Sequence, residues 1–190
     1  MNRLHLVTGA AVAGAFLTGA PREARAQIAL GGDFDVGLPV VQATTPLFLG
    51  TGAGFDLRVG YRFRVPYQPL WITPELTAGY TDLSAQIIRV RPGLRVAFGQ
   101  FVIPFVYSHL GWGLTRFDPL GTADTQNRAA FVSGSGIALD AGAGVDFAVL
   151  RRLLVGAHLG YNVVDVGQAG TTLEWRAKWM SVGLGGTYLF

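Results

Sequence analysis

Hydrophobic residues in this chain recur at every second position over many short segments, and this period of two limits the possible folds more than any other feature. Between Ile28 and Leu38, alternate positions are hydrophobic or Gly, and the positions between them are acidic or small. A second segment, from Ala53 to Val65, repeats the pattern with Gly, Asp and Arg between the apolar residues. A helix would scatter the two sets around its circumference, whereas successive residues of a strand face opposite sides. The pattern therefore predicts β-strands with one apolar face.

Six further segments with the same alternation bring the expected number of strands to eight. The eight ranges are 28–40, 53–65, 70–80, 88–98, 104–114, 139–147, 155–162 and 180–190. A tilted strand needs roughly 9–11 residues to cross a bilayer, and bacterial single-chain barrels have an even number of strands. Beyond Gln27 no run of 18 apolar residues offers a transmembrane helix. We therefore expect an all-β fold, an eight-stranded antiparallel transmembrane β-barrel, which leaves no unpaired strand edge in lipid.

The composition agrees with a membrane-embedded barrel. Half of the 190 residues are hydrophobic and 14% are charged, against roughly 25% charged residues in ordinary soluble proteins. Such hydrophobicity excludes an intrinsically disordered chain. A soluble, lipocalin-like barrel would need polar residues outside, but the polar face here is rich in Gly and too small to cover a surface. Because the chain has no Cys, it has neither a disulfide framework nor a thiolate metal site.

The first 26 residues have the order of regions that defines a secretory signal peptide. Arg3 opens a short basic stretch, residues 4–20 are mainly apolar and small, and Ala24-Arg25-Ala26 is a small-x-small cleavage site. We expect cleavage after Ala26, which leaves residues 27–190 as the barrel domain; an uncleaved membrane anchor is the alternative. The remaining chain carries 12 Lys and Arg against 11 Asp and Glu. This near-neutral charge gives no electrostatic reason to expect a nucleic-acid partner.

The connections between the expected strands alternate in length. Three are short, at residues 66–69, 99–101 and 150–152. The other four, including the one between the third and fourth strands, are expected to be mostly longer; residues 116–136 form the longest, with an extension of the sixth strand expected near Phe131 and Val132. Short periplasmic turns alternating with longer extracellular loops are typical of outer-membrane barrels and place both termini in the periplasm. Pro74 and Pro92 fall inside expected strands, where a ladder donor is lost, and predict a bulge or a shifted strand boundary at each.

Each face of the expected barrel carries one informative set of side chains. The apolar face carries aromatic residues near both rims, where rings meet lipid headgroups. These predicted girdles contain Phe55, Tyr80, Trp112 and Tyr161 at one end and Phe63, Phe98, Phe147, Tyr188 and Phe190 at the other. The inward face carries six basic and six acidic residues, namely Arg58, Arg62, Arg64, Arg89, Arg91, Arg95, Asp33, Asp35, Asp56, Glu75, Asp140 and Asp146.

These twelve charges predict an ion-pair plug. An eight-stranded barrel has an interior just wide enough for side chains to fill, and isolated buried charges are costly, so opposite charges there must pair. The inward Gly residues leave space for the long Arg side chains. A narrow gated pore is the alternative interpretation of the same residues.

Two His residues, His109 and His158, are also expected to face inward. A metal or acid–base role would need a third convergent group, and Asp140 or Asp146 could approach both; a hydrogen-bonded structural role is the simpler interpretation. Ser108 precedes His109 on one strand, so their side chains face opposite sides and cannot form a nucleophile–base pair. We therefore assign no catalytic, cofactor-binding or metal-binding residue, and we expect no cofactor.

The end of the chain resembles the C-terminal signal of outer-membrane barrels. Its residues are Val182-Gly183-Leu184-Gly185-Gly186-Thr187-Tyr188-Leu189-Phe190, in which alternating hydrophobic or aromatic residues, here Leu184 and Tyr188, precede the terminal Phe190. With the signal peptide and the strand count, the whole mature chain resembles the small OmpA/OmpX-type barrel superfamily. The resemblance implies the outer membrane of a Gram-negative bacterium, contact with its lipid and lipopolysaccharide, assembly by the barrel insertion machinery, and a role in envelope integrity, adhesion or surface defence. We expect a monomer.

The expected function is a structural or surface-interaction role that the extracellular loops mediate. Residues 116–136 are the candidate surface for a ligand, because variable function on barrels resides in loops. Some small outer-membrane barrels are lipid A-modifying enzymes. That alternative survives only through the loops, where Ser133, Ser135 and Asp124 have no His nearby. A small-solute pore is the third alternative.

Overall fold

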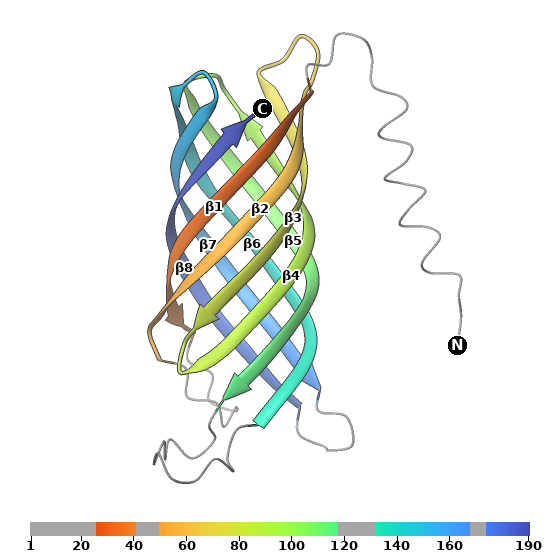
Figure 1. Ribbon diagram of the computed structural model, residues 1–190, viewed down its shortest axis with the longest axis vertical. Coiled ribbons are helices and arrows are strands. Elements are labelled where there is room, and N and C mark those ends of the chain that lie inside the picture. The colour runs from red at the N-terminus through yellow and green to blue at the C-terminus, as the bar shows by residue number, and fades with distance from the viewer. Residues whose placement is uncertain (1–25, 41–49, 118–131, 168–173) are drawn as a thin grey trace, which may run out of the picture.

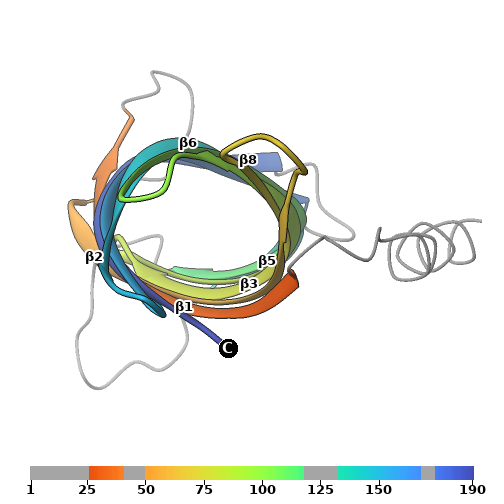
Figure 2. The same cartoon turned by 90° about the horizontal axis from the view of Figure 1, so that it is seen from above.

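The computed structural model describes residues 26–40, 50–117, 132–167 and 174–190, which form eight strands. The strands are β1 (Ala26–Pro39), β2 (Gly52–Arg64), β3 (Leu70–Asp82), β4 (Ala85–Phe98), β5 (Val102–Phe117), β6 (Val132–Leu150), β7 (Leu153–Gly167) and β8 (Glu174–Leu189). Each strand pairs antiparallel with its neighbours in sequence, and β8 pairs with β1, so the sheet closes into a barrel (Figure 1). Figure 2 shows the closed ring along the barrel axis. The predicted eight-stranded antiparallel barrel is confirmed.

The predicted signal peptide lies outside the described residues, except for Ala26, with which β1 begins. In the four described ranges, no helix is long and apolar enough to cross a membrane.

The register of the ladders sets the tilt of the strands. A path that crosses every ladder at right angles runs through Ala29, Gly60, Glu75, Gly93, His109, Asp140, Asn162, Trp179 and Pro39. The path returns to β1 ten residues beyond its start, from Ala29 to Pro39. Such a stagger requires strongly tilted strands, as Figure 1 shows. The same stagger decides which inward side chains meet inside the barrel.

All strands except β2 are longer than the alternation predicted, above all at the end opposite the short turns. β6 begins at Val132, in agreement with the expected extension of this strand. The prediction of a longer connection between the third and fourth strands is wrong, because Leu83 and Ser84 alone join β3 to β4. Ser84 has a positive φ of 67°. The tight turn forms because Leu83 is fully buried inside the barrel and continues the inward face of β3.

Pro74 and Pro92 produce neither a bulge nor a shifted strand boundary, so that prediction is also wrong. Pro74 lies inside β3 and Pro92 inside β4, and the ladder between these two strands is continuous through both residues. Each Pro also faces a second ladder: Pro74 that between β3 and β2, and Pro92 that between β4 and β5. Two residue pairs are missing from each of these ladders, yet the register is the same before and after the gap. A missing N–H removes a hydrogen bond on one side only, and the intact ladder on the other side holds the register.

The outer surface of the barrel is apolar over most of its height. Large hydrophobic side chains such as Leu57, Val90 and Leu159 are about half exposed on it. An exposed apolar surface of this extent requires a lipid environment. Among the predicted girdle residues Phe63 is half-buried, and the exposed ones are Phe55, Tyr80, Trp112 and Tyr161 toward one end and Phe98, Phe147, Tyr188 and Phe190 toward the end with the short turns.

Beyond the girdle farther from the short turns, the two faces of the sheet exchange their character. In β7 and β8 the inward residues there are Val164, Val166, Ala177 and Trp179, and the outward residues are Asp165, Arg176 and Lys178. Polar residues outside and apolar residues inside are the pattern of a β-sheet in water. The exchange therefore marks the height at which the barrel leaves the lipid.

Candidate functional site in the barrel interior

The interior of the barrel is filled by three layers of side chains. An ion-pair layer occupies the middle, and an apolar layer closes each end. The turn-side layer, at the end of the short turns, contains Ala29, Ala97, Ile103, Phe105, Leu154 and Leu189. The loop-side layer, at the other end, contains Leu83, Ala85, Ile87, Ala138, Val164, Val166, Ala177 and Trp179. A water-filled passage would have to cross all three layers.

The ion-pair layer is centred on Glu75, His109 and Asp140, which lie on one path across the ladders. His109 on β5 pairs in register with Gly93 on β4 and with Asp140 on β6, and Glu75 on β3 lies on the far side of Gly93. A Cβ atom on Gly93 would lie 2.1 Å from His109 Cδ2 and 2.3 Å from the Ser108 carbonyl oxygen. The missing side chain at Gly93 therefore lets the imidazole reach the Glu75 carboxylate.

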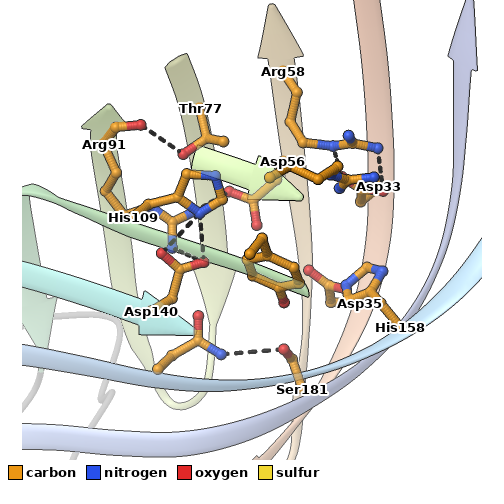
Figure 3. A pocket seen from close by; sticks show the side chains of 13 residues that line it. Asp33, Asp35, Asp56, Arg58, Thr77, Arg91, His109, Asp140, His158 and Ser181 are labelled. Carbon is orange, nitrogen blue, oxygen red and sulfur yellow. Dashed lines mark hydrogen bonds and ion pairs between the residues drawn. The ribbon is translucent and has the colours of Figure 1, made fainter. Parts of the chain in front are cut away.

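Both ring nitrogens of His109 contact carboxylates. Nε2 lies 2.9 Å from Glu75 Oε1, and Nδ1 lies 3.1 Å from each carboxylate oxygen of Asp140, a contact drawn in Figure 3. Only the doubly protonated imidazolium can donate from both nitrogens. The geometry is thus that of a buried cation between two anions. Asp140 approaches His109 as predicted, whereas the contact with Glu75 is one that the alternation did not indicate.

Two arginines continue the network toward the loop-side layer. Arg91 Nη2 lies 2.7 Å from Asp56 Oδ1, and Arg91 Nη1 lies 3.1 Å from Asp140 Oδ2. Arg89 Nη2 lies 3.3 Å from Asp56 Oδ2, and Arg89 Nη1 donates to Asn162 Oδ1 at 2.7 Å. Both guanidinium groups are almost fully buried. Asp56 is therefore held by two arginines, and Arg91 bridges it to Asp140.

A second branch of the network leads from Glu75 to β1 and β6. Arg58 donates to both carboxylate oxygens of Asp33, as Figure 3 shows, and its Nη1 lies 3.7 Å from Glu75 Oε2. Arg95 lies between two acids, with Nε 3.5 Å from Glu75 Oε1 and Nη1 3.5 Å from Asp146 Oδ2. Glu75 thus contacts both arginines as well as the imidazole.

The second inward His forms a separate pair. His158 Nε2 lies 2.8 Å from Asp35 Oδ1, so the prediction that Asp140 or Asp146 approaches both His residues is wrong for His158. Asp35 lies on β1 and His158 on β7, with β8 between them. Gly183 on β8 pairs in register with both residues and has no side chain to separate them. A Cβ atom on Gly183 would lie 1.9 Å from Asp35 Oδ1 and 2.6 Å from His158 Cε1. Glycines on intervening strands therefore open the way for both His–carboxylate contacts.

Two of the six predicted lumen arginines form no ion pair with a described residue. Arg64 is exposed at the end of β2, with its guanidinium carbon 5.7 Å from the centre of the Trp71 ring, so its assignment to the network is wrong. The alternation gives its side correctly, but β2 ends there and the side chain faces the rim. Arg62 is buried and lies over Trp71 at 4.2 Å. His109 takes the place of Arg64 among the inward cations.

The junction between the ion-pair layer and the turn-side layer consists of cation–aromatic contacts. The guanidinium carbon of Arg95 lies 4.1 Å from the centre of the Phe105 ring. Trp71, beneath Arg62, donates from Nε1 to the carbonyl oxygen of Gly99 at 3.2 Å. The face of an aromatic ring attracts a guanidinium group, while the rest of the aromatic side chain is apolar. These aromatic residues can therefore contact the ion-pair layer on one side and the apolar layer on the other.

The loop-side layer is the part of the interior that the alternation missed. Leu83 reaches across the lumen to β1 and β8: a Cβ atom on Gly37 would lie 2.6 Å from Leu83 Cδ2 and 3.2 Å from Trp179 Cδ1. A signal for this layer was present in the sequence. Consecutive apolar residues, Ile87-Ile88 and Val163-Val164, interrupt the alternation where each strand approaches the loops. They mark positions at which both faces are apolar.

The interior side chains are connected mainly by ion pairs and hydrogen bonds. In the described part of the chain, no group of three or more His, Asp or Glu residues could hold a metal ion. Ser108 lies on the outer face and His109 inside, as predicted from their adjacency. The cavity in the ion-pair layer, whose lining Figure 3 draws, has a volume of about 20 Å³, enough for about one water molecule.

Comparison with known proteins identifies the fold. No family model and no curated protein matches the chain. The N-terminal β-barrel domain of Pseudomonas aeruginosa OprF is 14% identical with a TM-score of 0.52, over 87% of this chain and 100% of that one. Neisserial surface protein A and Ail, the attachment invasion locus protein of Yersinia pestis, are each 16% identical with a TM-score of 0.51, over 87% of this chain and 97% of theirs. The chain has the fold of the small eight-stranded outer-membrane β-barrels.

Proposed function

We propose that the protein resides in the outer membrane of a Gram-negative bacterium as a sealed barrel with a structural or surface-interaction role. The observation that carries this proposal is the filled interior, in which an ion-pair layer lies between two apolar layers and leaves a cavity of about 20 Å³. A barrel filled in this way is unsuited to transport, so its function resides at its surface. The apolar outer face between two aromatic girdles supports the membrane location.

In the proposed orientation, both termini and the short turns lie in the periplasm. Three turns of this end join β2 to β3, β4 to β5 and β6 to β7. The opposite end carries Asp165, Arg176 and Lys178 on its outer face, at the height where lipopolysaccharide headgroups would surround the barrel. Residues 41–49, 118–131 and 168–173 connect strands at that end and lie outside the described residues. Protease added to intact cells should cleave within these connections and leave the short turns uncut; the reverse pattern would refute the orientation.

The surface-interaction role is assigned to the longest of these connections. Of the predicted ligand surface, residues 116–136, only the ends are described, in β5 and β6. The name of Ail, a barrel of the same fold, refers to attachment and invasion, and this supports a surface role for a barrel of this kind. We propose such a role for residues 118–131 here.

Assembly through the C-terminal signal is part of the proposal. Leu184, Tyr188 and Phe190 are all exposed along the outer face of β8 and beyond its end, where another protein can contact them. This placement supports recognition by the barrel insertion machinery. We propose a monomer, because closure of the sheet leaves no strand edge among the described strands for pairing with a second copy.

Planar-bilayer recording tests the sealed barrel directly. The purified full chain, folded in detergent and shown to migrate differently on a gel with and without boiling, is added to both sides of a bilayer. We expect no conductance steps, while a large porin added in parallel gives them. Reproducible steps from the folded fraction would refute the sealed barrel and favour the pore alternative.

Exchange of the long connection tests the surface role. Residues 118–131 are replaced by a short Gly-Ser linker, and binding of cells that display each protein to host-cell surfaces is measured. We expect the variant to lose binding while its gel migration, and hence its barrel, is unchanged. Equal binding by both proteins would contradict the assignment to this connection.

A further inference from the structure

The β6–β7 turn breaks the alternation of the outer surface. Ala148 pairs with Leu154, but the next pair is Leu150 with Leu153, so the register shifts and Val149 is an extra residue. As a result Val149 and Leu150, which are consecutive, are 60% and 63% exposed. A bulge that turns two adjacent aliphatic side chains outward is unfavourable in water. Lipid around the turn would cover both side chains and remove this cost.

Two arginines follow these aliphatic residues directly. Arg151 and Arg152 form the two-residue turn itself, and both are exposed. The backbone of the turn is fixed, because the carbonyl oxygen of Arg152 accepts a hydrogen bond from the Leu189 amide at 2.8 Å. A two-residue turn cannot lift its side chains far from the strands it joins. Both guanidinium groups are thus held just beyond the apolar band.

Exposed aromatic residues of neighbouring strands surround the turn. Phe147 lies on β6, and Tyr188 on β8 pairs in register with Leu153. Phe190 follows β8, and its ring packs edge-on against that of Tyr188 with 4.8 Å between ring centres. These rings continue the lipid-facing surface up to the arginines. We call the set Phe147, Val149, Leu150, Arg151, Arg152, Tyr188 and Phe190 the turn patch.

The two arginines of the turn patch have no anionic partner among the described residues. None of the described ion pairs includes either of them. Asp146, the described acid nearest along the chain, is buried inside the barrel and contacts Arg95. At the opposite rim the arrangement differs, because Arg176 pairs there with Asp165. The turn patch therefore presents two guanidinium groups that have no described acid within ion-pair distance.

We propose that the turn patch binds anionic phospholipid headgroups of the leaflet that it faces. A guanidinium group donates two parallel hydrogen bonds to a phosphate, and two adjacent ones can hold one or two lipid phosphates. The apolar and aromatic side chains below them contact acyl chains and keep the arginines at headgroup depth. The inference depends on the proposed function only for the identity of the leaflet, which is the periplasmic one if the proposed orientation holds.

Lipid-specific fluorescence quenching tests this inference. Because the chain has no Cys, Leu150→Cys provides a single attachment site for an environment-sensitive fluorophore in the full chain, folded into phosphatidylcholine vesicles. A small fraction of lipid is then replaced by brominated phosphatidylglycerol or, separately, by brominated phosphatidylcholine. We expect phosphatidylglycerol to be enriched at the fluorophore about fivefold or more, roughly what one cation near an anionic surface contributes. The enrichment should fall as salt is raised.

Charge variants and a second position provide the controls. In the Leu150→Cys background, R151Q/R152Q should abolish the enrichment, whereas R151K/R152K should retain most of it. The same fluorophore at Ile88→Cys, an exposed position toward the other rim, should show no change between native and R151Q/R152Q chains. Equal quenching by both lipids, or an enrichment that R151Q/R152Q leaves intact, would overturn the proposal.

A third outcome would also overturn it. If no brominated lipid quenches the fluorophore at position 150, the turn patch lies in water and its arginines serve an acidic partner in solution instead. Conductance steps in the bilayer recording, by contrast, would refute the sealed barrel without bearing on this inference. The two proposals can therefore fail independently.

Discussion

Replacement of Arg91 by Gln should destabilise the barrel by about 3 kcal/mol. Arg91 is almost fully buried and contacts Asp56 at 2.7 Å and Asp140 at 3.1 Å. Removal of one partner from a buried ion pair costs about 3–5 kcal/mol, because the remaining charge is left buried without compensation. The lower end of that range applies here, since Asp56 keeps Arg89 and Asp140 keeps His109.

Urea unfolding of the full chain folded into vesicles measures this loss. The four Trp residues report the transition through their fluorescence. We expect the midpoint to fall while the dependence of the unfolding free energy on urea is unchanged, as for a loss of stability without a change in the exposed surface. The matched control is Arg64→Gln, which removes an exposed Arg without an ion pair among the described residues and should cost less than about 0.5 kcal/mol.

A double-mutant cycle with Asp56→Asn separates the ion pair from general damage. Because Arg91 and Asp56 are in contact, the effects of Arg91→Gln and Asp56→Asn should not add, and the coupling should lie in the range of about 0.5–3 kcal/mol found for contacting residues. Additive effects, or an Arg91→Gln loss no larger than that of Arg64→Gln, would refute the view that the ion-pair layer is held by specific pairs.

Three further predictions follow from other parts of the barrel. Gly93→Ala should destabilise the barrel by about 1–3 kcal/mol in the same assay, because the new methyl group would meet the Ser108 carbonyl oxygen. Gly32→Ala should cost far less, because a Cβ atom there would have no neighbour closer than 3.7 Å. Equal losses would contradict the close approach at Gly93. Leu83→Ala should cost about 2–5 kcal/mol through a cavity in the loop-side layer, and Leu139→Ala on the lipid face less than half of that; the reverse order would contradict the layer. Phe190→Ala should slow the appearance of the folded, heat-sensitive gel band in cells, and an unchanged rate would count against the proposed assembly signal.

The number of strands and the side on which each residue lies could be predicted because both depend on local geometry. Successive strand residues face opposite sides whatever their partners are, so the alternation assigned Asp33 and Arg58 to the interior and Leu57 to lipid. It worked best in the middle of the strands, where lipid outside and a polar layer inside impose opposite demands. The alternation predicted less near the loops, where Leu83 belongs to a two-residue turn and its side chain is buried inside the barrel.

The partners within the interior could not be predicted in the same way. Alternation gives the side of a residue but neither its height in the barrel nor the strands it reaches. It therefore included Arg64, which lies at the rim, and paired His158 with β6, although its partner Asp35 lies on β1. Glu75 and His109 meet because Gly93 lies between them, and only the register reveals that.

The sequence alone determined the architecture. Eight segments alternate with a period of two, which requires strands, and no apolar run beyond Gln27 is long enough for a transmembrane helix. Strands that lie in lipid must close into a barrel. The tertiary structure decided which charges pair and where the apolar layers lie. The physical reason is the stagger of ten residues on closure, which brings distant positions of different strands to the same height. Such closure is a property of the whole ring, whereas the alternation is a property of each strand.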